Sequence, residues 1–489
     1  MTSSPVAESS GTARRLVGAA VVYGLGGVVS RLASLLALPL LTRFLAPADY
    51  GVIAMLGLMT NLLGAAVMLG TGNSLGICYH EAKAPADRAA VVWSTSAVVV
   101  ASAAAWALLG FLFSGPISRL LFDTAAYSTA VALAFGQMAV TSAVSPLLAR
   151  WRMEEKARPY VFATAGLAVA TVAANVVAVA VLRLGLLGML WSTFLVQSIY
   201  CGFLYVIFWA HDAPRPVAGW MRRVVRLGWP SMFGVGAFFM LDFGGRLILE
   251  HYAGLESLGV YSVALMLGLG IAILTEGAFA AAWPGFFLTF FDRTAVASQV
   301  FGKVFHYYLV VFLGLAAAFF LFARPVVEFL SAPPYHAAAK VVGLIALCSV
   351  LKGAYLIFLP GLYFERKLHV QTTLEWSGAL VGIALAFALV PRFGIVGAAV
   401  ATVTGYLFLV VATALVARRY LPTDVDVPRV ALLVVSFVAV AWLSAIDLLL
   451  PAGVDLALRV ALWLGYLLFV WRVFVGRSIA DVRRELQAT

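Results

Sequence analysis

A few ionisable residues fall inside long apolar runs, where a charge is expensive. They are Arg31, Asp242, Arg246, Glu276, Lys352 and, nearer the end of its run, Glu375. On insertion scales a charged side chain at the centre of a bilayer costs about 2.5–3.5 kcal/mol, so such residues usually face a cavity or a partner. Arginine grips phosphate oxygens, and the carboxylates of Asp242 and Glu276 are candidates for binding H+ or Na+.

Helical spacing places several of these charges on small or polar faces. One face of the first apolar run carries Gly24, Gly27, Arg31 and Ser34, a later run aligns Gly234, Phe238, Asp242 and Arg246, and a third stripe holds Gly57, Asn61 and Gly64. The simplest interpretation is a central cavity lined partly by positive charge. Its predicted substrate-binding residues are Arg31, Ser34, Asn61, Arg246 and Lys352.

Each of these assignments has a structural alternative. Asp242 and Arg246 lie four residues apart and are equally well interpreted as a pair that neutralises itself, and Glu276 can pair with Lys352 in the same way. Under this interpretation Glu375 snorkels to the membrane interface, and the glycine stripes are close helix packing. Asp242 and Glu276 are therefore either ion-coupling residues or members of structural pairs.

The elements that must position these residues are membrane helices. The 489 residues are 63% hydrophobic and 11% charged, whereas soluble domains are nearer one quarter charged. Apolar runs long enough for a spanning helix recur along the chain. We predict an all-α polytopic membrane protein of about 14 transmembrane helices, at roughly 16–42, 50–77, 90–113, 127–149, 159–182, 186–209, 225–250, 258–290, 303–323, 337–362, 370–390, 394–417, 429–450 and 456–474.

The net charge of +11 is a topology signal, because the positive residues are distributed unevenly over the predicted loops. One set of alternate loops holds most of them, and the other holds only Arg43, Arg119, Arg183, Arg324, Lys340, Arg392 and Arg459. By the positive-inside rule the richer set is cytoplasmic, which places both termini inside. The basic balance therefore indicates membrane topology, and we predict no nucleic-acid partner.

The chain has the pattern of a duplication. Gly51-Val52 aligns with Gly259-Val260, "FSGPISRLLFDTAAY" with "FARPVVEFLSAPPYH", "LRLGLLGMLWST" with "PRFGIVGAAVAT", and "RMEEK" with "YFERK". An even number of helices per repeat gives two parallel six-helix repeats, an architecture typical of alternating-access transporters. We predict a tail at 1–15, an N-lobe at 16–209, a linker at 210–224, a C-lobe at 225–417, two extra helices at 418–476 and a tail at 477–489.

Neither a catalytic constellation nor a cofactor motif is found in the sequence. The six histidines lack metal-ligand spacing, the three cysteines lack C-x-x-C spacing, and there is no P-loop. We predict that the chain is not an enzyme and has no cofactor, with H+ or Na+ as the candidate coupling ion.

The quoted motifs, together with "SRLASLLALPLLTRFLAPADYGVIAM" from Ser30, resemble the polysaccharide transporter family, the oligosaccharide flippases of surface-polysaccharide pathways. That family is part of a superfamily with multidrug exporters and lipid II flippases. The resemblance implies a location in the bacterial cytoplasmic (inner) membrane and a polyprenyl-pyrophosphate-linked oligosaccharide as cargo, for O-antigen or exopolysaccharide. It also implies a polymerase and export machinery as partners. Ser30-Arg31 resembles a Ser-Arg pair of a cationic cavity in lipid II flippases, and Asp49 resembles an acid at their first outer turn. In those relatives helices 13 and 14 form a lipid-facing groove.

The rivals are a cation-coupled multidrug exporter of the same fold, a lipid II flippase, and a channel or passive scaffold. Drug exporters of this superfamily usually place acids in the lobe cavities, whereas the first six predicted helices hold no mid-span Asp or Glu. The sign of the charge favours the flippase.

Overall fold

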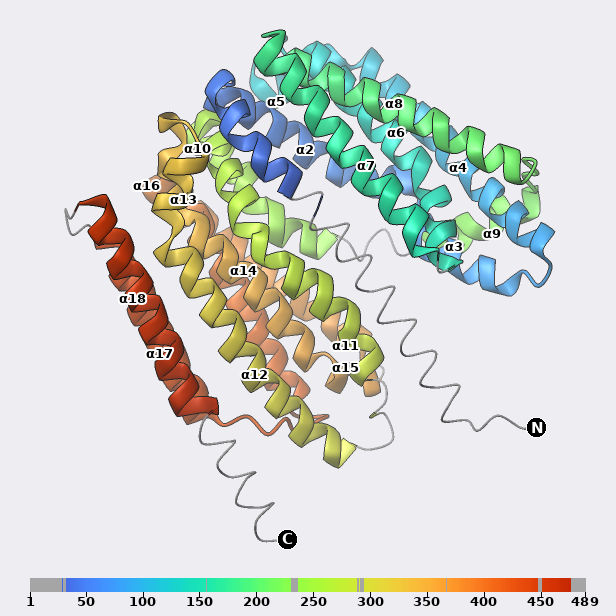
Figure 1. Ribbon diagram of the computed structural model, residues 1–489. Coiled ribbons are helices and arrows are strands. Elements are labelled where there is room, and N and C mark those ends of the chain that lie inside the picture. Colours follow the sequence, from blue (N-terminus) through green and yellow to red (C-terminus); the bar gives the residue numbers. More distant parts are fainter. Residues whose placement is uncertain are drawn as a thin grey trace. The chain divides into compact units, whose positions relative to one another are not determined.

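The computed structural model describes residues 29, 32–154, 156–229, 236–287, 290, 294–365, 367–446 and 451–475, and its regular elements in these ranges are all helical (Figure 1). Eleven of the described helices are long and apolar enough to cross a membrane. The predicted all-α, multi-pass membrane protein is confirmed. The count of 14 helices stays a prediction.

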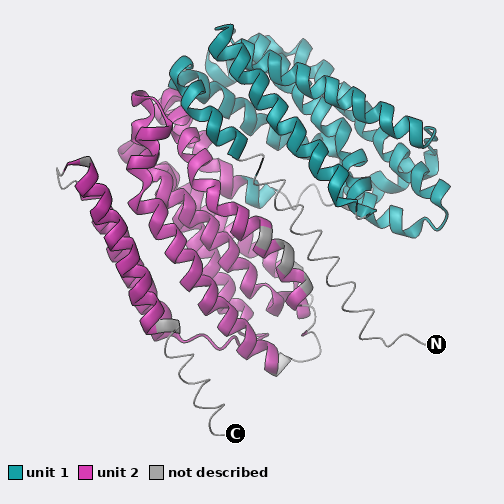
Figure 2. Ribbon diagram, viewed as in Figure 1, with its two compact units in different colours: residues 1–239 teal, residues 240–489 magenta. Residues whose placement is uncertain are grey.

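The chain divides into two compact units, residues 1–239 and 240–489 (Figure 2). Unit 1 contains a short apolar helix, Leu32–Phe44, followed by α2 (Pro47–Met68), α3 (Thr71–Glu81), α4 (Pro85–Leu112), α5 (Ser114–Phe122), α6 (Ser128–Met153), α7 (Ala157–Val176), the π-helix η1 (Val177–Val181), α8 (Gly185–His211) and α9 (Ala218–Gly228).

Unit 2 begins within α10 (Gly236–Gly268). It continues through the 3-10 helix η3 (Leu269–Ile271), the π-helix η4 (Ile273–Phe279), α11 (Ala280–Phe287), α12 (Thr294–Leu321), α13 (Ala323–Leu330), the 3-10 helix η6 (Pro333–Ala338), α14 (Ala339–Phe358), α15 (Pro360–Phe364), α16 (Leu368–Ala417), α17 (Val427–Ser444), α18 (Ala452–Val470) and the π-helix η7 (Trp471–Val475).

Local chemistry explains where α2 begins. Pro47 is its first residue, a position where the missing amide hydrogen costs nothing because no intrahelical bond is made there. The Asp49 carboxylate accepts a hydrogen bond from the backbone amide of Ala46 at 3.0 Å. This satisfies one of the orphan donors at the helix start and places a negative charge at the positive end of the helix dipole. Asp49 therefore has a capping role at this turn.

Several predicted boundaries are wrong. The predicted helix 50–77 is broken because Leu69 and Gly70 both adopt left-handed backbone conformations, with φ of 48° and 67°. The predicted loops 114–126 and 324–336 contain the short helices α5 and α13, and the predicted linker contains α9. The predicted helix 258–290 is instead an α-, 3-10, π- and α-helical sequence, and Glu276 lies on its π-helical turn. Single π-turns in α-helices frequently mark functional sites.

Local features at equivalent positions support the predicted duplication. Gly185 and Gly394 both have positive φ, at 60° and 53°, and they occupy the same place in the aligned "GLLG" and "GIVG" motifs. The amide of Lys156 donates to Trp151 O, and that of Lys367 donates to Leu362 O, both at 2.8 Å. These four residues align at the "RMEEK" and "YFERK" turns, so the two halves end the corresponding helix by the same hydrogen bond.

Candidate functional site

A cluster of charged side chains lies inside unit 2. Lys352 Nζ, on α14, lies 2.9 Å from Asp242 Oδ2 on α10 and 3.4 Å from Glu276 Oε2 on η4. The other oxygen of Asp242 accepts a hydrogen bond from the hydroxyl of Tyr406, on α16. The side chains of Lys352, Asp242 and Glu276 are 25%, 28% and 35% exposed. Two carboxylates therefore share one ammonium group.

Close helix packing brings the residues of this cluster together. α16 breaks at Gly394, where φ is 53° and ψ is −126°, a conformation open to glycine and strained for other residues. A Cβ added to Gly405 would lie 3.1 Å from the carbonyl oxygen of Gly378, across the two halves of this helix, and 3.1 Å from Leu241 of α10. Because glycine at 405 lets the backbones approach, the neighbouring Tyr406 reaches Asp242.

Arg246 lies outside the ion pairs of this cluster. The structural alternative in which Asp242 pairs with Arg246 does not hold, since the oxygens of Asp242 contact Lys352 and Tyr406. The Arg246 guanidinium carbon lies 4.6 Å from the centroid of the Phe243 ring, a cation–π contact. Its Nε atom is buried and has no hydrogen-bond partner among the described residues. Arg246 therefore retains hydrogen-bonding capacity that the protein does not use.

The predicted pairing of Glu276 with Lys352 is present, and it changes the interpretation of Lys352. Sequence analysis placed Lys352 among the substrate-binding cations, but the structure places its ammonium group between two acids. Tyr406 belongs to the same cluster and was not predicted. Tyrosines in a membrane protein are usually assigned to interfacial belts, so its type gave no signal of a buried role.

A polar cavity of about 570 Å³ lies inside unit 1. Side chains of α2, α6 and α8 line it with amides and hydroxyls: Thr60, Asn61, Gln137, Thr141, Ser142, Ser145 and Gln197. The lining contains no ionisable side chain among the described residues. The Oε1 atom of Gln197 is buried without a hydrogen-bond partner in this part of the chain, which leaves an acceptor for a ligand.

The predicted glycine stripe lies along this cavity. Gly57 and Gly64 both line it, and a Cβ added at either position would meet nothing within 4 Å among the described residues. Among the described residues of unit 1, no helix packs closely against this stripe. Asn61 lies between them and is exposed, with its amide nitrogen donating to Gly57 O at 2.8 Å.

The first helix is described only in part. Ser34 is half-buried on the helix Leu32–Phe44. Arg31, Gly24 and Gly27 lie outside the described residues. The cavity residues Gln137 and Gln197 were not predicted, because they carry no charge. An uncharged amide inside an apolar run is nevertheless a signal of a polar cavity.

Two acids near helix ends have structural roles. Glu375 is 6% exposed and accepts hydrogen bonds from Tyr355 and Gln371 at 2.6 and 2.8 Å, so the snorkelling interpretation is wrong. Glu154 of the "RMEEK" turn pairs with Arg150 and Lys156, both at 2.7 Å. Burial raises the pKa of the Glu154 carboxyl, but hydrogen bonds and charge from these two cations outweigh it, and its pKa lies below the usual value.

An open apolar groove lies between the two C-terminal helices. It has a volume of about 500 Å³ and is lined by residues of α17 and α18, among them Val440, Leu462, Tyr466 and Phe469. This is the place where the resemblance implies a groove for lipid.

Comparison with known proteins finds a family match over part of the chain. Residues 40–276 match the family model described as "Polysaccharide biosynthesis protein". An uncharacterized membrane protein of Methanocaldococcus jannaschii is 24% identical over 205 residues, and the alignment spans 38% of this chain and 38% of that relative.

Three solved structures share the fold. The lipid II flippase MurJ in an inward closed conformation has a TM-score of 0.69 at 10% identity, covering 94% of this chain and all of that one. An inward-facing multidrug resistance MATE family transporter of the MOP superfamily has a TM-score of 0.61 at 14% identity, covering 80% and 94%. A MOP superfamily transporter from Pyrococcus furiosus, whose binding pocket is described as having reverse polarity, has a TM-score of 0.59 at 15% identity, covering 83% and 95%.

Proposed function

We propose that this chain is a lipid-linked oligosaccharide flippase. The family match over residues 40–276 and the fold shared with MOP-superfamily transporters support this proposal. The proposed flippase moves a polyprenyl-pyrophosphate-linked oligosaccharide from the cytoplasmic to the outer leaflet by alternating access, for surface-polysaccharide biosynthesis. We propose accordingly that it is not an enzyme, and that a polymerase and export machinery take over its cargo.

The observation that carries this proposal is the uncharged, polar lining of the cavity in unit 1. Amide and hydroxyl side chains each donate and accept hydrogen bonds, and they match the hydroxyl groups of a glycan. An exporter of organic cations needs acids in such a cavity, and the described lining residues include none. The drug-exporter alternative is therefore less well supported than the flippase.

We assign the anionic part of the cargo to arginine. Arg31 is the proposed main contact for the pyrophosphate, and Arg246 is the second, supported by its buried Nε atom without a described partner. Ser34 and Asn61 are the proposed polar contacts. Lys352 is proposed for the coupling cluster instead of the cargo site, because both of its neighbouring acids contact it.

The same cluster supports cation coupling. Asp242 and Glu276 carry two negative charges against the single ammonium group of Lys352. Binding of H+ or Na+ by the carboxylates would remove this imbalance, and two protonation states of the cluster would give the transporter two arrangements to alternate between.

The proposed location is the bacterial cytoplasmic membrane, with both termini cytoplasmic. In a cysteine-free background, single cysteines at Ala125 and Ala337 should react with an impermeant reagent added outside intact cells, and one at Ala218 should not. All three positions are exposed, whereas Ser331, in the same predicted outer segment as Ala337, is 8% exposed and unsuitable. The reverse labelling pattern would contradict the orientation.

The transport function is tested by deleting the gene and analysing lipid-linked intermediates. We expect a polyprenyl-pyrophosphate oligosaccharide to accumulate on the cytoplasmic side, and surface polysaccharide to disappear until the gene is restored. Accumulation of lipid II instead would identify a lipid II flippase. Unchanged glycolipids with raised sensitivity to cationic drugs would identify an exporter.

A further inference from the structure

A second polar pocket lies in unit 2, away from the charged cluster. It has a volume of about 550 Å³ and opens between α13 and α14 on one side and α17 and α18 on the other. Arg324, Lys340 and Arg459 line it together with Glu328 and His336. The three cations belong to the small set that the sequence assigns to the extracytoplasmic side. Three of the seven positive residues predicted for that side therefore line one pocket.

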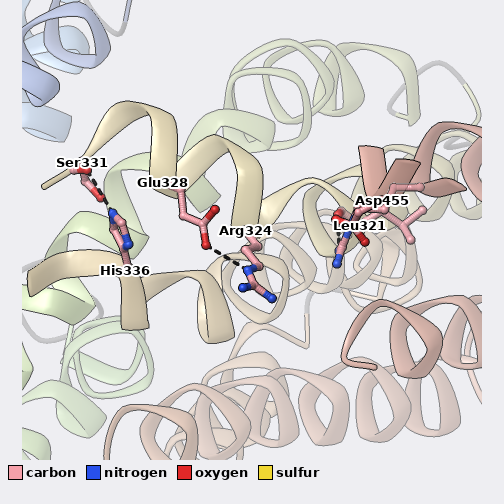
Figure 3. A network of polar contacts seen from close by, with 7 residues as sticks. Leu321, Arg324, Glu328, Ser331, His336 and Asp455 are labelled. Atoms are coloured by element: carbon pink, nitrogen blue, oxygen red, sulfur yellow. Dashed lines mark hydrogen bonds and ion pairs between the residues drawn. The ribbon is translucent and has the colours of Figure 1, made fainter. Parts of the chain in front are cut away.

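Two of these cations are already compensated. Arg324 pairs with Glu328 at 2.9 Å on α13, as Figure 3 shows. Arg459 is 6% exposed, pairs with Asp455 at 2.7 Å and donates to the carbonyl oxygen of Leu321 at 2.8 Å. The last bond satisfies an orphan acceptor at the end of α12, so Arg459 fixes α18 against α12 and forms one wall of the pocket.

Lys340 is the uncompensated charge of the pocket. It is exposed at the start of α14 and has no hydrogen-bond or ion-pair partner among the described residues. The remaining walls are largely apolar, with Phe320, Leu344 and Val396. A ligand that matches this lining has one negative charge and an apolar body beside it.

The corresponding place in unit 1 lacks these charges. There, α4, α5 and α6 enclose a cavity of about 360 Å³ lined by apolar residues such as Phe113, Ile117 and Phe135. In the alignment that pairs Phe113 with Phe322, Gly115 stands opposite Arg324 and Val131 stands opposite Lys340. The corresponding helix ends of unit 1 form without these cations, so the cations are specific to the unit 2 pocket.

We propose that this pocket binds the headgroup of an anionic phospholipid, with Lys340 as the principal contact for a phosphodiester of single negative charge. Basic pockets between transmembrane helices bind anionic lipid headgroups on the cytoplasmic side of membranes, and the same charge attraction applies in this pocket. A lipid is favoured over free phosphate because the cations adjoin apolar walls on helices α12, α14, α17 and α18, all of them long and apolar enough to span a membrane.

The test uses the full chain in nanodiscs of equal phosphatidylglycerol and phosphatidylcholine, with retained lipid identified by native mass spectrometry after release. Wild-type protein should retain phosphatidylglycerol preferentially, and Lys340→Glu should lower that preference about tenfold or more, since it replaces an attractive charge with a repulsive one. The matched control is Arg119→Glu, a charge reversal on the exposed face of α5, the counterpart of α13 in unit 1.

A melting temperature equal to that of the wild type will show that Lys340→Glu is folded, and Lys340→Gln, which removes the charge without reversing it, is the second variant. An equal loss in Arg119→Glu, or no preference in the wild type, would overturn the proposal. Displacement of the lipid by inorganic phosphate would overturn the lipid as the occupant and assign the pocket to free phosphate.

Discussion

Lys352→Gln should abolish transport and destabilise the protein by about 3 kcal/mol, the low end of the range for removing one partner of a buried ion pair. The reason is geometric: Asp242 and Glu276 both depend on the Lys352 ammonium group, at 2.9 and 3.4 Å. Without it, two carboxylates are left close together in a partly enclosed site. The low end of the range applies because the three side chains are 25–35% exposed. The measurements are export of polysaccharide in cells and the thermal stability of the purified protein.

A neutral triple variant separates the structural from the coupling role. Asp242→Asn, Glu276→Gln and Lys352→Gln together remove all three charges and keep side chains that hydrogen bond, so stability should return to within about 1 kcal/mol of the wild type. If the cluster couples transport to H+ or Na+, this stable variant will still fail to transport. Recovery of transport along with stability would show that the cluster is a structural ion pair.

Matched single variants assign the two acids. Asp242→Asn keeps an acceptor for Tyr406 and removes the closer of the two negative charges on Lys352, whereas Glu276→Gln removes the more distant one. We expect the stronger transport defect for Asp242→Asn, because Asp242 makes two of the described contacts of the cluster. Equal retention of transport in both variants would contradict coupling through either carboxylate.

The fold was predictable where an apolar run is long enough to span the membrane. Hydropathy and length identify spanning helices because every backbone polar group in the bilayer must be bonded within its own segment. The misses are short or local. α5 and α13 have nine and eight residues, too few for periodicity to separate a helix from a loop. The break at Leu69 rests on a left-handed leucine, which residue type does not predict.

The charged members of the candidate site were predictable, together with one of its two ion pairs, that of Glu276 with Lys352. Asp242, Glu276 and Lys352 were identified because a charge inside an apolar run is costly. Which charges meet depends on how α10, η4 and α14 pack, so spacing within one helix could not decide whether Asp242 pairs with Arg246. The cavity of unit 1 was not predicted for a different reason. Gln137 and Gln197 carry no charge, and their shared role is recognised only when α2, α6 and α8 are seen to line the same cavity.

Arg31→Ala should stop export of the polysaccharide while protein abundance in the membrane stays near that of the wild type. The prediction rests on the sequence: Arg31 is the cation of an apolar run that contains no acid to neutralise it. A guanidinium that grips a pyrophosphate supplies two parallel hydrogen bonds as well as charge. Arg31→Lys keeps the charge and loses this fork, so it should transport at an intermediate rate.

Arg43→Ala is the matched control for Arg31→Ala, because Arg43 is exposed near the end of the same predicted helix and should tolerate the change.

Arg246→Ala should give a weaker defect than Arg31→Ala. It leaves the contacts of Asp242 with Lys352 and Tyr406 in place, so a loss of transport in a stable Arg246→Ala protein will report on cargo binding. Normal export by Arg31→Ala, or a defect explained wholly by loss of folded protein, would remove Arg31 from the cargo site. In that case the uncharged cavity of unit 1 and Arg246 would be the remaining candidates for cargo contact.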